Sequence, residues 1–213
     1  MIHGFGICLI LAVSVLRGTS APASEIFEYY NGSRQMGMGG AAVAVVNDET
    51  ALLLNPAALG KLRDTFLTLV DPEAEMNAKT YSVYEEGGLG SFFSPQKILD
   101  TLADKPGEPY HTKFQLFPSL VLSNFGMGVH AKYVADAIVN AETNQFEYNY
   151  TNDIALVLGY NFRLFDGRIK IGFNVKYLNR VEVRKTDLDV TSTDLKIADL
   201  ASEGAALSSD IGL

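Results

Sequence analysis

Two long runs of alternating residues, joined by Asp166-Gly167, limit most strongly what this chain can fold into. In each run every second position is apolar, and the positions between are mostly small, polar or charged. The apolar positions are Ile154, Leu156, Leu158, Tyr160, Phe162 and Leu164 before the turn, and Ile169, Ile171, Phe173, Val175 and Tyr177 after it. A period of two is typical of a β-strand whose faces meet different environments. Asp-Gly between two such runs predicts a hairpin with a type I′ turn.

The length of the two runs favours a membrane protein. Strands of soluble proteins usually have about 5–6 residues, whereas each run here continues for about 15. A tilted membrane strand needs about 9–11 residues to cross the hydrocarbon core. The apolar face suits lipid, and the polar face suits a lumen. The sequence therefore predicts an all-β fold, an antiparallel transmembrane β-barrel.

The first residues of the chain indicate export. Residues 5–16 form an apolar run too short to span a membrane as a helix, and Ala21-Pro22-Ala23 follows as a small-x-small pattern. This order predicts a signal peptide over residues 1–23, cleaved after Ala23. A buried N-terminal strand or helix is the alternative. The single cysteine, Cys8, lies in this segment, so the mature chain would have no thiol for catalysis or a disulfide.

Composition and motifs exclude several classes of function. The formal net charge is −8, whereas a protein that binds nucleic acid needs a basic surface. The sequence has no nucleophile elbow, phosphate-binding glycine loop, paired catalytic carboxylates or metal-ligand spacing. We therefore expect no enzyme, no cofactor and no bound metal. An export signal together with membrane strands predicts a bacterial outer-membrane protein in contact with outer-membrane lipids.

The rest of the chain divides into two parts. Residues 24–62 are rich in glycine and alanine and do not alternate, whereas residues 63–213 carry the predicted barrel strands. Asp48 could cap a short helix over residues 49–54, which Pro56 would end. The further strands are expected at 66–70, 80–84, 116–122 and 127–135, and a second short helix at 95–103, with Ser94 as its cap.

The connections between the predicted strands alternate in length. Short turns at Asn124 and at Asp166-Gly167 alternate with longer polar connections at residues 139–149 and 186–206, as in outer-membrane barrels. Residues 205–213 predict the beginning of one more strand. The resulting number of strands is below the minimum of about eight in single-chain bacterial barrels. We therefore expect the sequence to be the N-terminal part of a longer barrel.

Residues 32–59 carry a specific motif. It consists of the run Gly32-Ser33-Arg34-Gln35-Met36-Gly37-Met38-Gly39-Gly40-Ala41-Ala42 and, further on, Asn55-Pro56-Ala57-Ala58-Leu59. This motif resembles the N-terminal signature of the FadL-like / PorV-like outer-membrane superfamily. That superfamily includes transporters of long-chain fatty acids and aromatic hydrocarbons, and PorV-like proteins associated with type IX secretion. The resemblance implies that residues 37–59 fold back into the barrel as a hatch or plug. The region up to Phe114 looks closer to the PorV-like branch.

Two groups of residues are candidate sites. The first is the plug motif: Gly37, Gly39, Gly40, Asn55, Pro56 and Ala57. These residues could form a moving hatch that opens a path for a ligand, or the turn and packing positions of a static plug. The second is a set of lumen-facing basic residues: Lys132, Arg163, Lys170, Lys176, Arg180 and Arg184. They could attract the carboxylate of an amphipathic ligand, or pair with Glu182, Asp136 and loop acids in an ordinary polar interior.

These features lead to three functional hypotheses. The first is passive uptake of a hydrophobic or amphipathic small molecule through the plugged lumen. The alternative, which the resemblance suggests, is a PorV-like role in which the barrel receives or anchors secreted proteins. A third hypothesis is a structural or adhesive barrel whose long connections form the working surface. We expect aromatic girdles at the membrane interfaces from Tyr148, Tyr150, Tyr160, Phe162 and Tyr177, and a hydrophobic path for a ligand is the alternative for these rings.

Overall fold

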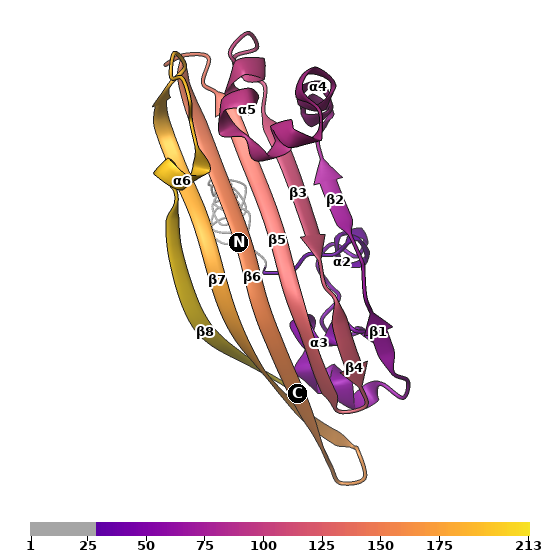
Figure 1. Ribbon diagram of the computed structural model, residues 1–213. Coiled ribbons are helices and arrows are strands. Elements are labelled where there is room, and N and C mark those ends of the chain that lie inside the picture. The colour runs from indigo at the N-terminus through magenta and orange to yellow at the C-terminus, as the bar shows by residue number, and fades with distance from the viewer. Residues whose placement is uncertain (1–28) are drawn as a thin grey trace, which may run out of the picture.

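The computed structural model describes residues 29–213, and the predicted signal peptide with Cys8 lies outside them. Eight strands of the described chain form one antiparallel β-sheet, so the all-β prediction is confirmed (Figure 1). Its strands are β1 (Phe66–Thr68), β2 (Glu73–Met76), β3 (Tyr110–Leu116), β4 (Ser119–Leu122), β5 (Phe125–Val139), β6 (Gln145–Leu164), β7 (Ile169–Asp189) and β8 (Ser202–Gly212). Strand β8 bears out the strand predicted over residues 205–213.

The strands follow one another across the sheet in the order β1-β4-β5-β6-β7-β8, and β3 pairs with both β2 and β5. Strands β3 and β4 both pair with β5, and the chain leaves the ladder between them at Phe117-Pro118. Proline has no N–H to give to the ladder, which explains the break. The strand predicted over residues 116–122 therefore corresponds to β4, and most of β3 was not predicted. Within residues 29–213 the sheet is open, with β1 and β2 on one side and β8 on the other.

The β6–β7 hairpin is confirmed, with strands of 20 and 21 residues. Its last paired residues are Leu164 and Ile169, so the loop has two more residues than a type I′ turn. Phe165, Asp166 and Gly167 all have positive φ, at 52°, 54° and 82°. The loop therefore differs from the predicted turn, although Asp166-Gly167 lies at its centre.

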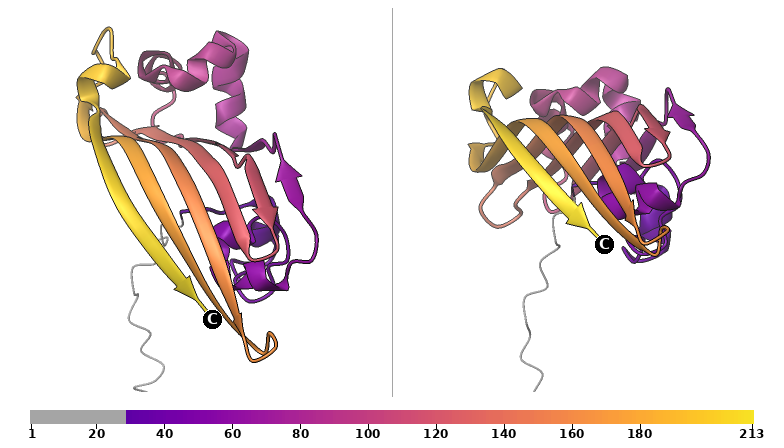
Figure 2. Two further views of the ribbon diagram at one scale, coloured as in Figure 1. Left: turned by 60° about the horizontal axis from the view of Figure 1, so that its bottom comes forward. Right: turned by 90° about the horizontal axis from the view of Figure 1, so that it is seen from below.

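The two faces of the sheet differ at the end near this hairpin loop. We call the face that carries Leu158 the outer face, and its exposed apolar side chains the apolar band. The band comprises Leu67, Leu116, Leu122, Met127, Val129, Ile154, Leu156, Leu158, Tyr160, Phe162, Leu164, Ile169, Phe173, Val175, Tyr177, Leu207 and Ile211. The opposite, inner face is covered at this end by the N-terminal segment, residues 29–62 (Figure 2).

The N-terminal segment contains three short helices: α2 (Ser33–Gly37), α3 (Ala51–Leu54) and the 3-10 helix η1 (Pro56–Lys61). Helix α3 begins two residues later than predicted, and Asp48 Oδ1 accepts a hydrogen bond from Thr50 N before it, at 3.1 Å. The described chain also contains α4 (Ala78–Gly87), η2 (Leu89–Phe93), α5 (Pro95–Leu102) and α6 (Ile197–Leu200), so the prediction of one or two short helices is wrong. None of the helices within residues 29–213 is long and apolar enough to cross a membrane.

The other end of the sheet is covered on its outer face. Helix α4 (Ala78–Gly87), the 3-10 helix η2 (Leu89–Phe93) and helix α5 (Pro95–Leu102) pack there, on the opposite side from the N-terminal segment (Figure 2). The core between them and the sheet contains Val83, Phe92, Ile98, Leu99, Leu102, Tyr110, Ala135, Ala137, Val139, Phe146, Tyr148, Tyr150 and Val183. We call α4, η2 and α5 the collar.

The collar confirms one sequence prediction and contradicts another. Helix α5 begins as expected, with the Ser94 hydroxyl accepting a hydrogen bond from Lys97 N at 3.5 Å. The strand predicted over residues 80–84 is wrong, because this stretch lies in α4. The Asn77 side chain caps α4 by accepting a hydrogen bond from Thr80 N at 2.9 Å. That cap starts a helix directly before the residues with high β-propensity.

The long connections are shorter than predicted, because the strands extend into them. Strand β5 ends at Val139 and β6 begins at Gln145, and the β7–β8 connection, with α6 (Ile197–Leu200), is confined to residues 190–201. Tyr148 and Tyr150 point to the outer face but are buried below the collar, at 0% and 6% exposure. They therefore do not belong to an exposed aromatic girdle. Tyr160, Phe162 and Tyr177 are exposed in the apolar band.

Candidate functional site

The motif Asn55-Pro56-Ala57 lies in the part of the N-terminal segment that packs most closely on the inner face. We call residues 51–62 the anchor. Within it Ala51, Leu52, Ala58 and Leu59 are fully buried. The Asn55 side chain begins η1 by accepting a hydrogen bond from Ala57 N at 3.0 Å, and Pro56 is the first residue of that helix. The Asn-Pro pair therefore sets the conformation of the anchor backbone.

Two glycines of the sheet make room for this backbone. A Cβ atom on Gly172 would come closer than 3.0 Å to the carbonyl carbon and oxygen of Pro56 and to Ala57 N. A Cβ atom on Gly212 would likewise come too close to the Asn55 side chain. Because all the atoms opposite Gly172 are backbone, only glycine permits the contact. The anchor thus fits into a hollow of β7 and β8 that these glycines leave.

Two asparagines of the sheet bind the carbonyl groups of the anchor. Asn161 Nδ2 on β6 donates a hydrogen bond to Ala57 O at 3.2 Å, and Asn174 Nδ2 on β7 donates to Leu52 O at 2.9 Å. Both asparagines are buried. Buried carbonyl groups need such donors, since they are cut off from water. The alternation of the sequence predicts that both asparagines face inward, but it does not predict what they bind. The repeated asparagines and glycines on this face could have indicated a closely packed backbone there.

The glycine run of the motif has a different environment. Gly37 and Gly39 are exposed, and a Cβ atom on either would meet nothing within 4 Å. Gly39 and Gly40 have φ of 62° and 82°, a conformation that glycine adopts at no steric cost. Gly37 is the last residue of α2, and Gly39 and Gly40 form the turn that follows it. The free space around Gly37 and Gly39 shows that neither packs against the sheet. We call residues 36–41 the glycine loop; the two halves of the motif are thus an exposed turn and a buried anchor.

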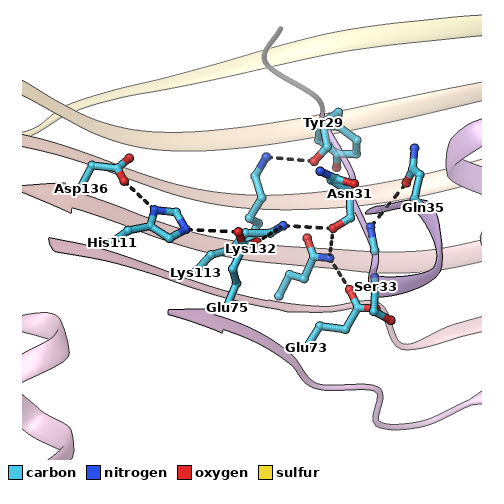
Figure 3. A network of polar contacts seen from close by, with 12 residues as sticks. Tyr29, Asn31, Ser33, Gln35, Glu73, Glu75, His111, Lys113, Lys132 and Asp136 are labelled. Atoms are coloured by element: carbon cyan, nitrogen blue, oxygen red, sulfur yellow. Dashed lines mark hydrogen bonds and ion pairs between the residues drawn. The ribbon is translucent and has the colours of Figure 1, made fainter. Parts of the chain in front are cut away.

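Residues 29–35, which we call the strap, cross the polar part of the inner face (Figure 3). Side chains of β3 and β5 bind its carbonyl groups. Lys132 Nζ donates to Tyr29 O at 2.9 Å, and Lys113 Nζ donates to Asn31 O at 3.0 Å. Gln115 Nε2 donates to the same Asn31 oxygen at 2.9 Å. The strap is therefore fixed by its backbone, a feature that the sequence pattern did not reveal.

The two tyrosines of the strap lie among rings and charges. The Tyr29 ring lies 4.8 Å from the ring of the buried His130, and Lys176 Nζ lies 4.9 Å from the Tyr29 ring centre, within range of a cation–π contact. Burial raises the pKa of the Tyr29 and Tyr30 hydroxyls above their usual range; for Tyr29 the next cause is the negative charge of Asp153. Both tyrosines therefore remain neutral at physiological pH.

Three of the six predicted basic residues come together in the middle of the inner face. Arg180 makes two hydrogen bonds to the fully buried Asp153, at 2.6 and 2.8 Å. Lys132 Nζ lies 3.8 Å from the same carboxylate, and Lys176 forms an ion pair with Asp210. This arrangement matches a polar interior in which charges pair with one another. Asp153 is the central acid of the cluster, and no sequence motif singled it out.

The other three basic residues lie elsewhere. Arg163 Nη2 donates to Ser123 Oγ at 2.7 Å, and Lys170 Nζ donates to Gly167 O at 2.8 Å, both near the hairpin loop. Arg184 lies at the opposite end of β7, where its largely exposed side chain pairs with Glu182. The six residues therefore do not form one continuous stripe. Asp136, expected as a partner, has its carboxylate 2.6 Å from His111 Nδ1 (Figure 3).

A cavity of about 850 Å³ lies on the inner face between the glycine loop and the strands. Its lining includes Met36, Gly39, Gly40, Glu75, His111, Lys113, Lys132, Val134, Asp136, Asn149, Thr151 and Arg184. The volume is in the range of about 300–1,000 Å³ that small-molecule sites occupy. The walls carry both signs of charge, with few apolar side chains. Such a cavity suits a polar or amphipathic molecule better than a purely apolar one.

Within residues 29–213 no group of three or more histidine, cysteine, aspartate or glutamate side chains is placed to hold a metal ion. Comparison of the chain with protein-family models, with curated proteins and with solved structures found no match. The resemblance of residues 32–59 to the FadL-like / PorV-like signature therefore stays a prediction.

Proposed function

We propose that this chain is the N-terminal part of a FadL/PorV-like transmembrane β-barrel of a bacterial outer membrane, and that its lumen passes small amphipathic molecules without energy input. The observation that carries the proposal is the contrast between the faces of one sheet. The outer face exposes the apolar band, and the inner face holds a cavity with charged walls that the N-terminal segment helps to line. In the proposed barrel, this segment is the plug.

The apolar band has the dimensions of a membrane-spanning surface. On β6 the band runs from Ile154 to Leu164. This length agrees with the number of residues, about 9–11, that a tilted strand needs to cross the hydrocarbon core. Soluble monomers rarely expose a continuous apolar surface of more than a few hundred Å². Because lipid offers no hydrogen bonds, the open edges at β1 and β8 need partners. The proposal therefore includes further strands between these edges.

The plug limits how a molecule can pass. The anchor is bound by Asn161 and Asn174 and fits against Gly172, so moving it would expose several backbone groups without partners. The glycine loop has no such contacts at Gly37 and Gly39. In the proposed mechanism the molecule enters the cavity from the collar end, the glycine loop rearranges, and the anchor stays in place.

A pair of tryptophan variants on one strand tests the proposal. Val134 lines the cavity, whereas Val129 points from the same strand to the apolar band. In phospholipid nanodiscs we expect the complete barrel that contains this chain to bind radiolabelled laurate, a simple amphipathic probe, at one molecule per barrel. Val134→Trp should reduce this binding at least tenfold by filling the cavity, and Val129→Trp should leave it unchanged. Absence of saturable binding, or equal effects of both variants, would contradict a lumenal site.

The firmly bound anchor also favours the second candidate function, a PorV-like role in protein secretion or surface attachment, in which the plug gates nothing. In that case deletion of the gene should trap exported proteins in the periplasm, and Val134→Trp should restore export as well as the wild-type chain does. A transporter should instead show no change in exported proteins on deletion.

A further inference from the structure

The collar lies directly beyond the apolar band on the same face. The last row of the band on β5 and β6 is Ala131 beside Ile154, and the next row on that face is Tyr133 beside Asn152. The ring of Phe93, from η2, lies 4.9 Å from the ring of Tyr133. Rows on one face are two residues apart, about 7 Å along a strand. The collar therefore begins within one row of the end of the band.

The polarity of the sheet changes at the same row. Asn152 and Glu203 replace the apolar side chains there on the outer face of β6 and β8. Asn179, beside Ile154 in the preceding row, donates from Nδ2 to Glu203 Oε1 at 2.9 Å. A surface that lies in hydrocarbon would not carry these groups. In the proposed barrel this row marks the boundary between hydrocarbon and headgroups.

The collar exposes aromatic side chains at this boundary. Phe93 is 53% exposed, Tyr81 56% and Tyr84 41%, although their neighbour Phe92 is buried. The rings form a connected series, with Tyr81 6.1 Å from Tyr84 and Tyr84 stacked on Phe92 at 5.9 Å. Aromatic side chains with one apolar and one polar end are enriched in the headgroup layer of membranes. In a water-soluble domain such aromatic rings would usually be buried, so their exposure here needs an explanation.

We propose that the collar lies in the headgroup layer of the bilayer and fixes the depth of the barrel, with Tyr81, Tyr84 and Phe93 in contact with lipid. The inference rests on the proposed function, because it requires the apolar band to lie in hydrocarbon. The helical collar then supplies the aromatic girdle at this boundary, where Tyr148 and Tyr150 of the strands are buried beneath it. The partner is the lipid surface, since the collar continues the band without a gap.

The absence of tryptophan from the sequence allows a direct test. The variants Phe93→Trp, Leu158→Trp and Met36→Trp each introduce one tryptophan into this sequence, in the collar, the middle of the band and the lining of the inner cavity. Any tryptophan elsewhere in the barrel is replaced by phenylalanine in all three variants. Each variant is placed in phospholipid bilayers whose lipids carry bromine either near the headgroup or near the end of the acyl chain. Bromine quenches tryptophan fluorescence only at close range, so the two lipids report depth.

For Phe93→Trp we expect quenching at least twofold stronger with headgroup-near bromine than with chain-end bromine. Leu158→Trp should show the reverse, and Met36→Trp should be quenched by neither. If Phe93→Trp behaves like Met36→Trp or like Leu158→Trp while Leu158→Trp is quenched from the chain end, the collar does not lie in the headgroup layer and the membrane barrel stands. If Leu158→Trp is not quenched, the membrane proposal fails and the inference fails with it.

Discussion

At the scale of single residues, Gly172 tests how tightly the anchor is held. The variant Gly172→Ala places a methyl group against the backbone of Pro56 and Ala57, atoms that cannot turn away. We expect a loss of about 1–3 kcal/mol in the free energy of unfolding, the usual cost of overpacking a fitted contact. The measurement is urea denaturation of the full chain in detergent, together with protease cleavage within residues 51–62, which should become faster.

Gly204→Ala is the matched control, because Gly204 also lies on the inner face and a Cβ atom there meets nothing within 4 Å. This variant should change the free energy of unfolding by less than about 0.5 kcal/mol, as surface substitutions do. Equal stability of the two alanine variants would show that the anchor does not rest on β7 as described.

The buried acid Asp153 makes a second prediction at this scale. Removing one partner of a buried ion pair costs about 3–5 kcal/mol, because a charge is left without compensation. The Arg180 side chain is 28% exposed, so Arg180→Ala should fall at the lower end of that range. Arg184→Ala removes an arginine from the same strand and face, but its side chain is 77% exposed, and its ion pair should contribute less than about 1 kcal/mol.

Both variants are compared by urea denaturation at low and at high salt. Added salt should reduce the small loss of unfolding free energy caused by Arg184→Ala. It should leave the loss caused by Arg180→Ala nearly unchanged, since buried charges are poorly screened. Similar losses for the two variants would mean that Asp153 is not held chiefly by Arg180.

At the scale of elements, regular alternation of apolar and polar residues predicted the strands reliably. It did not predict what covers each face of the sheet. The β6–β7 hairpin followed from a period of two, and helix α5 followed from Ser94-Pro95. The same alternation continues to Tyr150 and Tyr148, where helices cover the outer face. A period of two shows which side chains share a face, but it does not show whether lipid, water or a helix lies against that face.

Elements decided by tertiary contacts were missed for a related reason. Residues 80–84 have the β-propensity of a strand, yet the Asn77 cap and the burial of Val83 against the collar core favour a helix. The candidate site shows the same limit. The motif located the anchor and the glycine loop, whereas the partners Asn161, Asn174 and Asp153 come from strands far away in sequence and needed the sheet register to be found.

At the scale of the whole molecule, the central question is whether the apolar band lies in lipid, and the cost of a charge along one strand answers it. Leu158 lies in the middle of the band on β6, and Ile154 lies in its last row. In a bilayer, an outward arginine costs about 2–4 kcal/mol at the midplane and about 0–1 kcal/mol near the interface. Leu158→Arg should therefore destabilise the chain in phospholipid vesicles far more than Ile154→Arg does.

The comparison discriminates because both side chains are similarly exposed, at 43% for Leu158 and 52% for Ile154. On a surface in water the two arginine variants would have equally small effects, since exposed positions tolerate charge. Measured as unfolding free energies by urea titration in vesicles, a difference of about 2 kcal/mol or more places the band across the hydrocarbon core. A difference below about 0.5 kcal/mol would mean that the band does not lie in lipid but contacts a protein partner. The proposed membrane barrel and the proposed position of the collar in the headgroup layer would then both be contradicted.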